Sequence, residues 1–207
     1  MYHPPALPTL NLPSTLRRPE FAEVNRHVLV AIDPSYAQPA FSYIRHRLAL
    51  GGNEAYQALA STRVPKSYPR SHLPAAFDLP VSHNPPTHVL AVFSSQSTSD
   101  HVMLFPTYHV ALAANCAHLP RLPISRPRRR SDGTASVPVV TLTVPHAEVF
   151  EPLHTFLISH RPDLLMTALL PIPATLVPLA RSSNDKGPLG HLSPSQIASY
   201  LTSHAPG

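Results

Sequence analysis

The residue types that most often perform covalent or metal chemistry are scarce in this sequence. Its 207 residues include one cysteine, Cys116, six glycines and no tryptophan. A single cysteine cannot form an internal disulfide, which favours a reducing compartment. None of the glycines stands in the register of a phosphate-binding loop, so no nucleotide site of that kind is indicated.

Charged residues are also scarce, whereas proline is abundant. Charged side chains make up 13% of the chain and there are 27 prolines, where about 25% and roughly 5% are usual. Proline removes a backbone donor and fixes φ, so this content predicts long connectors between short elements. Because 43% of the residues are hydrophobic and several segments are periodic, disorder throughout the chain is not expected.

No apolar segment is suited to crossing a membrane. The longest apolar run, residues 164–180, contains three prolines, and prolines from Pro4 onward interrupt the beginning of the chain, where a signal peptide would lie. These features predict a soluble protein.

The first part of the chain predicts helices and connectors rather than a sheet. Residues 1–20 are a proline-punctuated tail, and residues 21–84 are expected to form a helical segment followed by a linker. Within it, residues 27–32 suit either a short strand or the end of a buried helix. Residues 63–86 contain six prolines and predict the linker or a long surface loop.

Two helices are expected within this segment. Apolar residues at helical spacing predict a helix over residues 35–50, which Gly51 and Gly52 would end by adopting the left-handed conformation. Asn53 can cap a second, shorter helix that runs to Ala60.

The second part of the chain, residues 85–205, is more regular. Residues 87–95 and 101–106 predict two strands joined by a polar hairpin connector, and residues 108–119 predict a helix that Pro120 ends. The basic stretch 121–136 is an expected exposed loop. A third strand is predicted over residues 137–144.

Three further helices follow this strand. One begins with Pro145 in its first turn, one covers residues 161–170, and one covers residues 193–201 with Ser193 as its cap. The predicted core is formed by the helix after residue 108, the strand before it and the helix after Pro145: Phe105, Leu112, Ala113, Cys116, Phe150, Leu153, Phe156 and Leu157.

Cys116 could form a nucleophilic pair with a neighbouring histidine, or it could be a packing residue. On a helix His109 lies seven residues earlier, about 10 Å away along the axis, and His118 faces elsewhere. A free cysteine is most often a small core residue. We therefore predict that Cys116 is buried and that the protein has no catalytic residues.

The fourteen histidines do not form a recognisable metal site. Structural zinc requires four ligands at short paired spacings. Here the tightest mixed pair is Cys116 and His118, and no second pair of ligands accompanies it. No metal or other cofactor is predicted. Glu148 and Glu151, three residues apart on a helix, could form an acid/base pair, but exposed acids on the polar face of an amphipathic helix are the ordinary case.

The densest charge cluster is "RPRRR", which contains Arg126, Arg128, Arg129 and Arg130. These side chains should project into water, where they could serve nuclear import, contact an acidic partner, or be solvated. No aromatic stripe, recognition helix or zinc framework accompanies them, so direct binding of nucleic acid is not favoured.

Two stretches resemble BTB/POZ domains. "FPTYHVALAANC", residues 105–116, is similar to the family's segment in which a strand ends in Phe and a helix begins, and residues 139–159 look like its third strand and following helix. The resemblance implies an α+β fold, a small sheet packed by helices, and a role in protein interaction. Self-association would be in keeping with it.

A closer resemblance is to the clampless-type developmental proteins of mushroom-forming fungi. It is carried by residues 86–95, 102–123 and 137–171, with "LAANCAHLP", "VPVV" and "FLISHRPDLLMTALLP" in succession. The resemblance implies a non-catalytic regulator of clamp-cell formation and dikaryotic growth, which binds transcription regulators of the mating-type programme in the nucleus. The alternative function is a nucleic-acid-associated basic regulator acting through residues 126–130.

Overall fold

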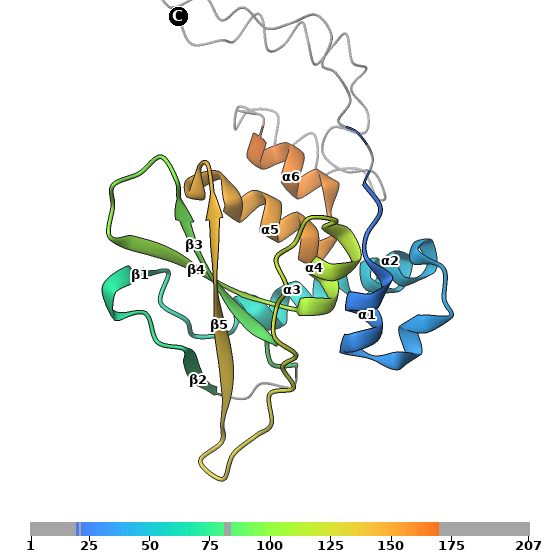
Figure 1. Cartoon of the computed structure of the whole chain (residues 1–207), viewed down its shortest axis with the longest axis horizontal. Coiled ribbons are helices and arrows are strands. Elements are labelled where there is room, and N and C mark those ends of the chain that lie inside the picture. Colours follow the sequence, from blue (N-terminus) through green and yellow to red (C-terminus); the bar gives the residue numbers. More distant parts are fainter. Residues whose placement is uncertain (1–19, 21, 81–83, 170–207) are drawn as a thin grey trace, which may run out of the picture. The chain divides into compact units, whose positions relative to one another are not determined.

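A curled, mixed sheet of five strands is the centre of the fold (Figure 1). Its spatial order is β1-β4-β3-β5-β2, in which β3 and β5 are parallel and the other neighbours are antiparallel. The strands are β1 (Ser67–Pro69), β2 (Ala76–Pro80), β3 (His88–Ser94), β4 (His101–Thr107) and β5 (Thr134–Val144).

The computed structural model describes Glu20, residues 22–80 and residues 84–169. From Glu23 onward these residues belong to one compact unit. The predicted tail and the predicted helix 193–201 lie outside the described residues, except for Glu20. The α-helices are α1 (Arg26–Ile32), α2 (Phe41–Leu50), α3 (Gly52–Ala60), α4 (His109–Asn115), α5 (Phe150–Ser159) and α6 (Pro162–Leu169).

The predicted order of hairpin, helix, third strand and two helices is confirmed. β3 and β4 form the hairpin, α4 follows, and β5 then returns to lie parallel to β3, with Val89 opposite Val139. Helices α5 and α6 complete the series. The α+β class predicted from the sequence is therefore correct.

The prediction of a linker or loop over residues 63–86 is wrong, because this stretch holds both edge strands of the sheet. β1 pairs with β4 and β2 pairs with β5. Pro69 and Pro80 are the last residues of these strands, where a missing N–H costs no central ladder bond. The prolines mark the strand ends here, although their density suggests an irregular segment.

The sheet curls until its two edges meet. The rings of Tyr68 on β1 and Phe77 on β2 pack edge to face, with centroids 5.6 Å apart. Together with Leu73 they pack around a buried cluster of Leu79, Val89, Ala91, Val102, Leu104 and Val137. The concave face of the sheet therefore encloses its own apolar core.

The helices cover the opposite face (Figure 1). Leu90 and Val92 of β3 pack there with Phe105, Leu112, Phe150 and Leu157. Because β3 contributes to both clusters, its residues from His88 to Val92 are buried on both sides. Such two-sided burial explains why this strand reads as a continuous apolar run.

The N-terminal helices differ from the prediction before α2. Residues 27–32 lie in α1, which settles the choice between strand and helix. The expected helix over residues 35–50 is interrupted: a short 3₁₀ turn, Pro34–Ala37, precedes α2, which begins at Phe41. Pro39 lies in the break, since proline cannot donate the backbone bond that a continuous helix needs.

Helix α4 ends four residues earlier than predicted. It stops at Asn115, and Cys116 is already extended, with φ −114° and ψ 108°. The Arg45 side chain donates from Nε to the carbonyl of Ala114 at 2.8 Å, which satisfies one of the free carbonyls at the helix end. Pro120 therefore does not set the end of the helix. The loop expected over 121–136 is also shorter, because β5 begins at Thr134.

Most predicted core residues lie in the interior, with one clear exception. Phe105, Leu112, Ala113, Phe150 and Leu157 are buried, and Cys116 and Phe156 are half-buried. Leu153 is 45% exposed and is not a core residue. The 3₁₀ turn Ala147–Val149 ends before α5, and the buried stripe of α5 then runs along its Phe150 side, leaving Leu153 facing out.

The two glycines between α2 and α3 do not act as expected. Gly51 has φ −91°, which is not left-handed, and Gly52 is the first residue of α3, so Asn53 lies inside the helix. A Cβ on Gly52 would lie 2.8 Å from the carbonyl carbon of Ser159 on α5, and closer still to its oxygen. Gly52 is therefore required for the close approach of α3 to α5.

Replacing Gly52 by alanine should destabilise the protein. The new methyl group meets backbone atoms, which cannot rotate away, so we expect the free energy of unfolding to fall by about 1–3 kcal/mol despite the higher helix propensity of alanine. Urea unfolding at pH 7 measures the change. Gly51→Ala is the matched control, because its nearest neighbour would be 4.0 Å away. Equal stability of Gly52→Ala and the unchanged chain would contradict the close-contact argument.

Candidate functional site

The four arginines of the loop before β5 are all exposed, but they are not equivalent. Arg130 forms an ion pair with Asp78 of β2, with Nη1 and Oδ2 2.9 Å apart. Arg126 donates from Nη2 to the carbonyl of Ile32 at 3.3 Å. In the described part of the chain, Arg128 and Arg129 take part in no ion pair. A partner could therefore bind Arg128 and Arg129 without first breaking an ion pair of the described structure.

Cys116 does not lie in an activated environment. It is half-buried beside the apolar cluster under the helices, and this burial raises the pKa of its thiol. A nucleophilic cysteine needs the opposite shift, since the thiolate is the reactive form. His101 and His118 are exposed, and His109 packs against the ring of His88 at 5.2 Å between centroids.

Sequence reasoning missed a buried polar cluster around His88 and His109. Thr87 Oγ1 accepts the backbone N–H of His109 at 2.7 Å, and His88 Nε2 donates to the carbonyl of Pro123 at 2.8 Å. Desolvation, followed by the charge of nearby His88, lowers the pKa of His109 to about 4. This imidazole is consequently neutral at pH 7, and the cluster ties the start of β3 to the loop after α4.

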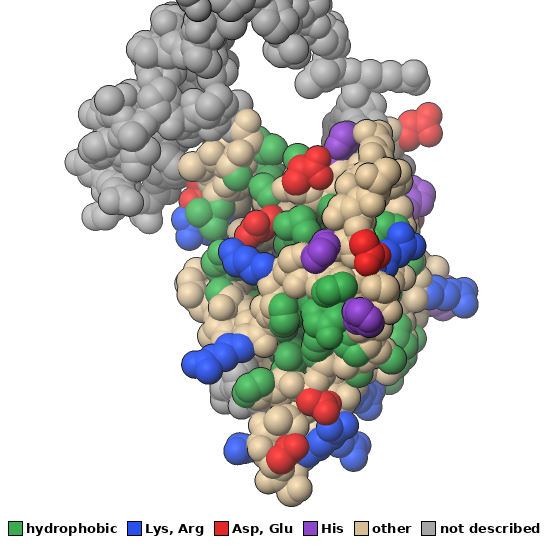
Figure 2. Space-filling model, turned by 90° about the vertical axis from the view of Figure 1, so that its left-hand side faces the viewer, with side chains coloured by type: hydrophobic (Ala, Val, Ile, Leu, Met, Phe, Trp, Pro, Cys, Tyr) green, Lys and Arg blue, Asp and Glu red, His purple; other side chains and the backbone are tan. Residues whose placement is uncertain are grey.

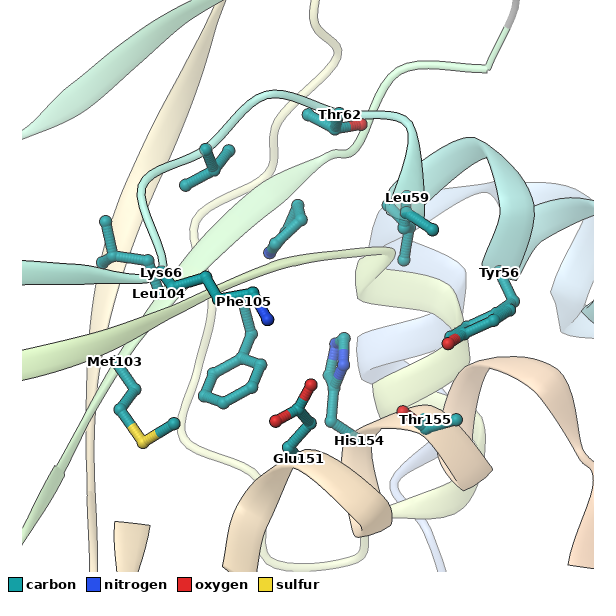
Figure 3. Close-up of a pocket in the computed structure, with 13 residues that line it drawn as sticks. Tyr56, Leu59, Thr62, Lys66, Met103, Leu104, Phe105, Glu151, His154 and Thr155 are labelled. Atoms are coloured by element: carbon teal, nitrogen blue, oxygen red, sulfur yellow. The ribbon is translucent and has the colours of Figure 1, made fainter. Parts of the chain in front are cut away.

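A cavity of about 310 Å³ lies between α3, the connector after it, β4 and α5 (Figure 3). Its apolar lining includes Leu59, Met103, Leu104 and Phe105. A pocket of this size that combines an apolar lining with a few polar groups is the usual form of a binding site.

Figure 2 shows the face on the β1 side of the molecule, where hydrophobic side chains gather among charges of both signs.

His154 is the most unusual residue of this cavity. It is 8% exposed, and its Nε2 atom has no hydrogen-bond partner among the described residues. Its ring lies 5.4 Å from that of Phe105, and burial lowers its pKa to about 4. The sequence carried one signal of this position: His154 stands on the apolar stripe of α5, four residues after Phe150 and three before Leu157.

The cavity also has one charge of each sign. Figure 3 shows Glu151 rising from α5 with His154, while Lys66 approaches from the strand side. Neither Lys66 nor Glu151 forms an ion pair within the described residues. Glu151, which the sequence suggests is an ordinary exposed acid, thus lines a cavity, although no second carboxylate lines it in the described structure.

Two features are absent from the described residues. They contain no group of three or more side chains placed to hold a metal ion. None of their helices combines the length and the apolar character needed to cross a bilayer.

Two of the three buried histidines, His109 and His154, have strongly lowered pKa values and predict a loss of stability in acid. In the unfolded chain an imidazole has a pKa near 6.5, whereas His109 and His154 have values of about 4 in the fold. Between these values the unfolded chain binds more protons. The free energy of unfolding should therefore be highest above pH 6.5. It should fall from there towards pH 4, by up to about 3 kcal/mol for each histidine.

Urea unfolding at pH 7 and at pH 4.5 tests this expectation. His154→Leu should make the difference between the two pH values smaller, because it removes one of the buried imidazoles whose pKa is lowered. The same change at exposed His101 should leave the difference as it is. A difference that His154→Leu does not alter would show that this imidazole is already protonated or reachable by water in the fold.

Comparison with known proteins identifies a family for this chain. A search of curated proteins finds no match, and neither does a search of solved structures. A family model described as the Clampless protein 1 N-terminal domain matches residues 19–145. This range contains all five strands and helices α1 to α4, and its name connects the family with clamp formation. Since the match covers well over half of the 207 residues, the chain belongs to the Clampless protein 1 N-terminal domain family.

Proposed function

We propose that this chain is a non-catalytic protein-interaction regulator of clamp-cell formation and dikaryotic growth in a fungus. Its partners are transcription regulators of the mating-type programme, and it works in the nucleus. The observation that carries this proposal is an exposed apolar surface at the end of the described chain. Five of the eight large apolar side chains exposed in the described structure lie between residues 149 and 169: Val149, Leu153, Leu164, Met166 and Leu169.

We call these five residues the α5–α6 surface. Their exposed fractions range from 37% for Leu164 to 61% for Val149. Exposed apolar side chains commonly mark a site of protein interaction where they gather, and these five come from one stretch of the chain, residues 149–169. The order of hairpin, helix, parallel third strand and two helices is also the order that a BTB/POZ-like interaction domain implies, which supports the same proposal for the region from residue 85 onward.

A helical surface is a better candidate for partner binding than a strand edge. The edge strands are only three and five residues long, and each ends in proline. Their side chains Tyr68 and Phe77 contact each other. Pairing with an added strand needs a long open edge with free N–H groups, so this mode of binding is disfavoured.

The chemistry of the described residues supports a non-catalytic role. The pKa of the Cys116 thiol is raised by burial, and the pKa values of His109 and His154 are lowered by it. An acid–base catalyst generally works with a pKa near the operating pH and with a partner that orients it. Neither imidazole has a carboxylate within hydrogen-bonding distance among the described residues.

The alternative function is association with nucleic acid through the loop arginines. Exposed Arg128 and Arg129 favour it, because they are not engaged by described acidic groups. A complex held by phosphate contacts weakens steeply as salt is added, whereas an apolar interface responds little. Binding measured at 50 mM and 200 mM salt therefore separates the two functions.

Changing the α5–α6 surface should strongly reduce partner capture. The intact chain is used to capture proteins from fungal nuclear extract, beside a Leu153→Ser, Leu169→Ser double variant. We expect the double variant to recover at least about tenfold less of the transcription regulators, because removing two apolar anchors from an interface core commonly costs more than 1.4 kcal/mol. The captured proteins are quantified by mass spectrometry.

Matched controls separate this surface from general hydrophobicity and from charge. Tyr43→Ser with Leu50→Ser removes two apolar side chains of α2 that are also well exposed, and it should leave capture intact, as should Cys116→Ser. Arg128→Ser with Arg129→Ser should leave capture intact if the apolar surface alone binds, and should reduce it if these arginines contact an acidic partner or nucleic acid. Failure of the intact chain to enter nuclei or to capture any transcription regulator would sink the proposed function.

A further inference from the structure

The cavity beside His154 is distinct from the α5–α6 surface, since none of its lining residues belongs to that surface. Three of its features together specify a ligand. They are the buried imidazole of His154, which has no partner among the described residues, the lining by Phe105 and Met103, and the opposite charges of Lys66 and Glu151. We propose that this cavity binds a phenolic group, that is, an aromatic ring carrying a hydroxyl, in contact with His154.

The imidazole supplies the first reason. Nε2 of His154 is buried and lacks a hydrogen-bond partner in the described structure, and leaving such an atom unpaired is costly. The ring is neutral at pH 7, so a neutral hydrogen-bonding group suits it best. Nε2 is closed to water in this structure, so the contact requires the His154 ring to turn towards the cavity. A hydroxyl both donates and accepts, and it then satisfies Nε2 in either tautomer of the imidazole.

The lining supplies the second reason. Phe105 lies beside His154 with their ring planes tilted by 46°, so a further ring can pack on them edge to face. Met103 lines the same cavity, and thioethers make favourable contacts with aromatic rings. The ammonium group of Lys66 can lie over the face of such a ring. An aliphatic ligand would gain none of these three contacts.

The charges supply the third reason. Lys66 and Glu151 reach the cavity from opposite sides (Figure 3) and balance each other. A ligand with a single charge would meet one favourable and one unfavourable group. An uncharged phenol meets no such conflict. The phenol can belong to a small molecule or to a tyrosine residue, and both present the same chemistry to the cavity.

Titration of the full chain with p-cresol, toluene and cyclohexanol, followed by two-dimensional NMR, tests the proposal. We expect p-cresol to bind in the millimolar range and at least about fivefold more tightly than either of the other two. Toluene lacks the hydroxyl and cyclohexanol lacks the aromatic ring. The shifted signals should include Phe105, Glu151 and Thr155, which line the cavity.

The His154→Leu variant isolates the hydrogen bond. It replaces an unpaired polar group by an apolar one of similar size, so it should fold, and it should bind p-cresol and toluene equally. His101→Leu, on the surface, should retain the preference for p-cresol. Equal binding of p-cresol and toluene to the unchanged chain, which needs no variant, would overturn the proposal, as would signals that shift only elsewhere.

A peptide arm distinguishes the two sources of the phenol. Acetyl-Gly-Tyr-Gly-amide and its Phe counterpart are titrated in the same way. Tighter binding of the tyrosine peptide than of p-cresol assigns the cavity to a tyrosine of a partner, and binding of p-cresol alone assigns it to a small molecule. Absence of binding by all of these probes up to their solubility rejects the phenolic site. Because no partner protein is used, this result does not depend on the proposed regulatory function.

Discussion

The parallel pairing of β3 with β5 is the interaction on which the rest of the structure depends. It joins a β1-β4-β3 half of the sheet to a β5-β2 half. Without it, the two edge strands could not meet, and the apolar cluster between Tyr68 and Phe77 would be open to water. The pairing needs a crossover, which α4 and the loop after it provide. The buried contact of His88 with the carbonyl of Pro123 fastens that loop to the start of β3.

Periodic segments of the sequence predicted the hairpin, the third strand and most helices, since these elements bury one clear face. What the sequence could not reveal depends on contacts between distant residues. β1 and β2 form because they can pair with β4 and β5. Their prolines, considered from the local sequence alone, predict a loop. Gly52 similarly suggests a helix end, and only the position of Ser159 shows that its missing side chain serves packing.

The candidate site was predicted less well than the fold, for a related reason. The choice between a nucleophilic and a packing role for Cys116 favours packing, because His109 packs on His88 and the thiol packs beside apolar residues. The cavity, in contrast, combines Lys66, Phe105 and His154 from three separate segments. Only the stripe position of His154 was visible beforehand. The loop arginines were identified correctly as exposed. Asp78 and the Ile32 carbonyl, which sequence reasoning could not supply, separate two bound arginines from two that have no ion pair among the described residues.

The close contact between Gly52 and Ser159 has a consequence for the walls of the cavity. α3 carries Tyr56 and Leu59, and α5 carries Glu151 and His154, so two of the walls are clamped to each other where the helix backbones touch. Because α3 and α5 are in contact through main-chain atoms, these two walls cannot move independently of each other. The cavity is thus preorganised, and a ligand would lose little binding free energy to rearrangement of the protein.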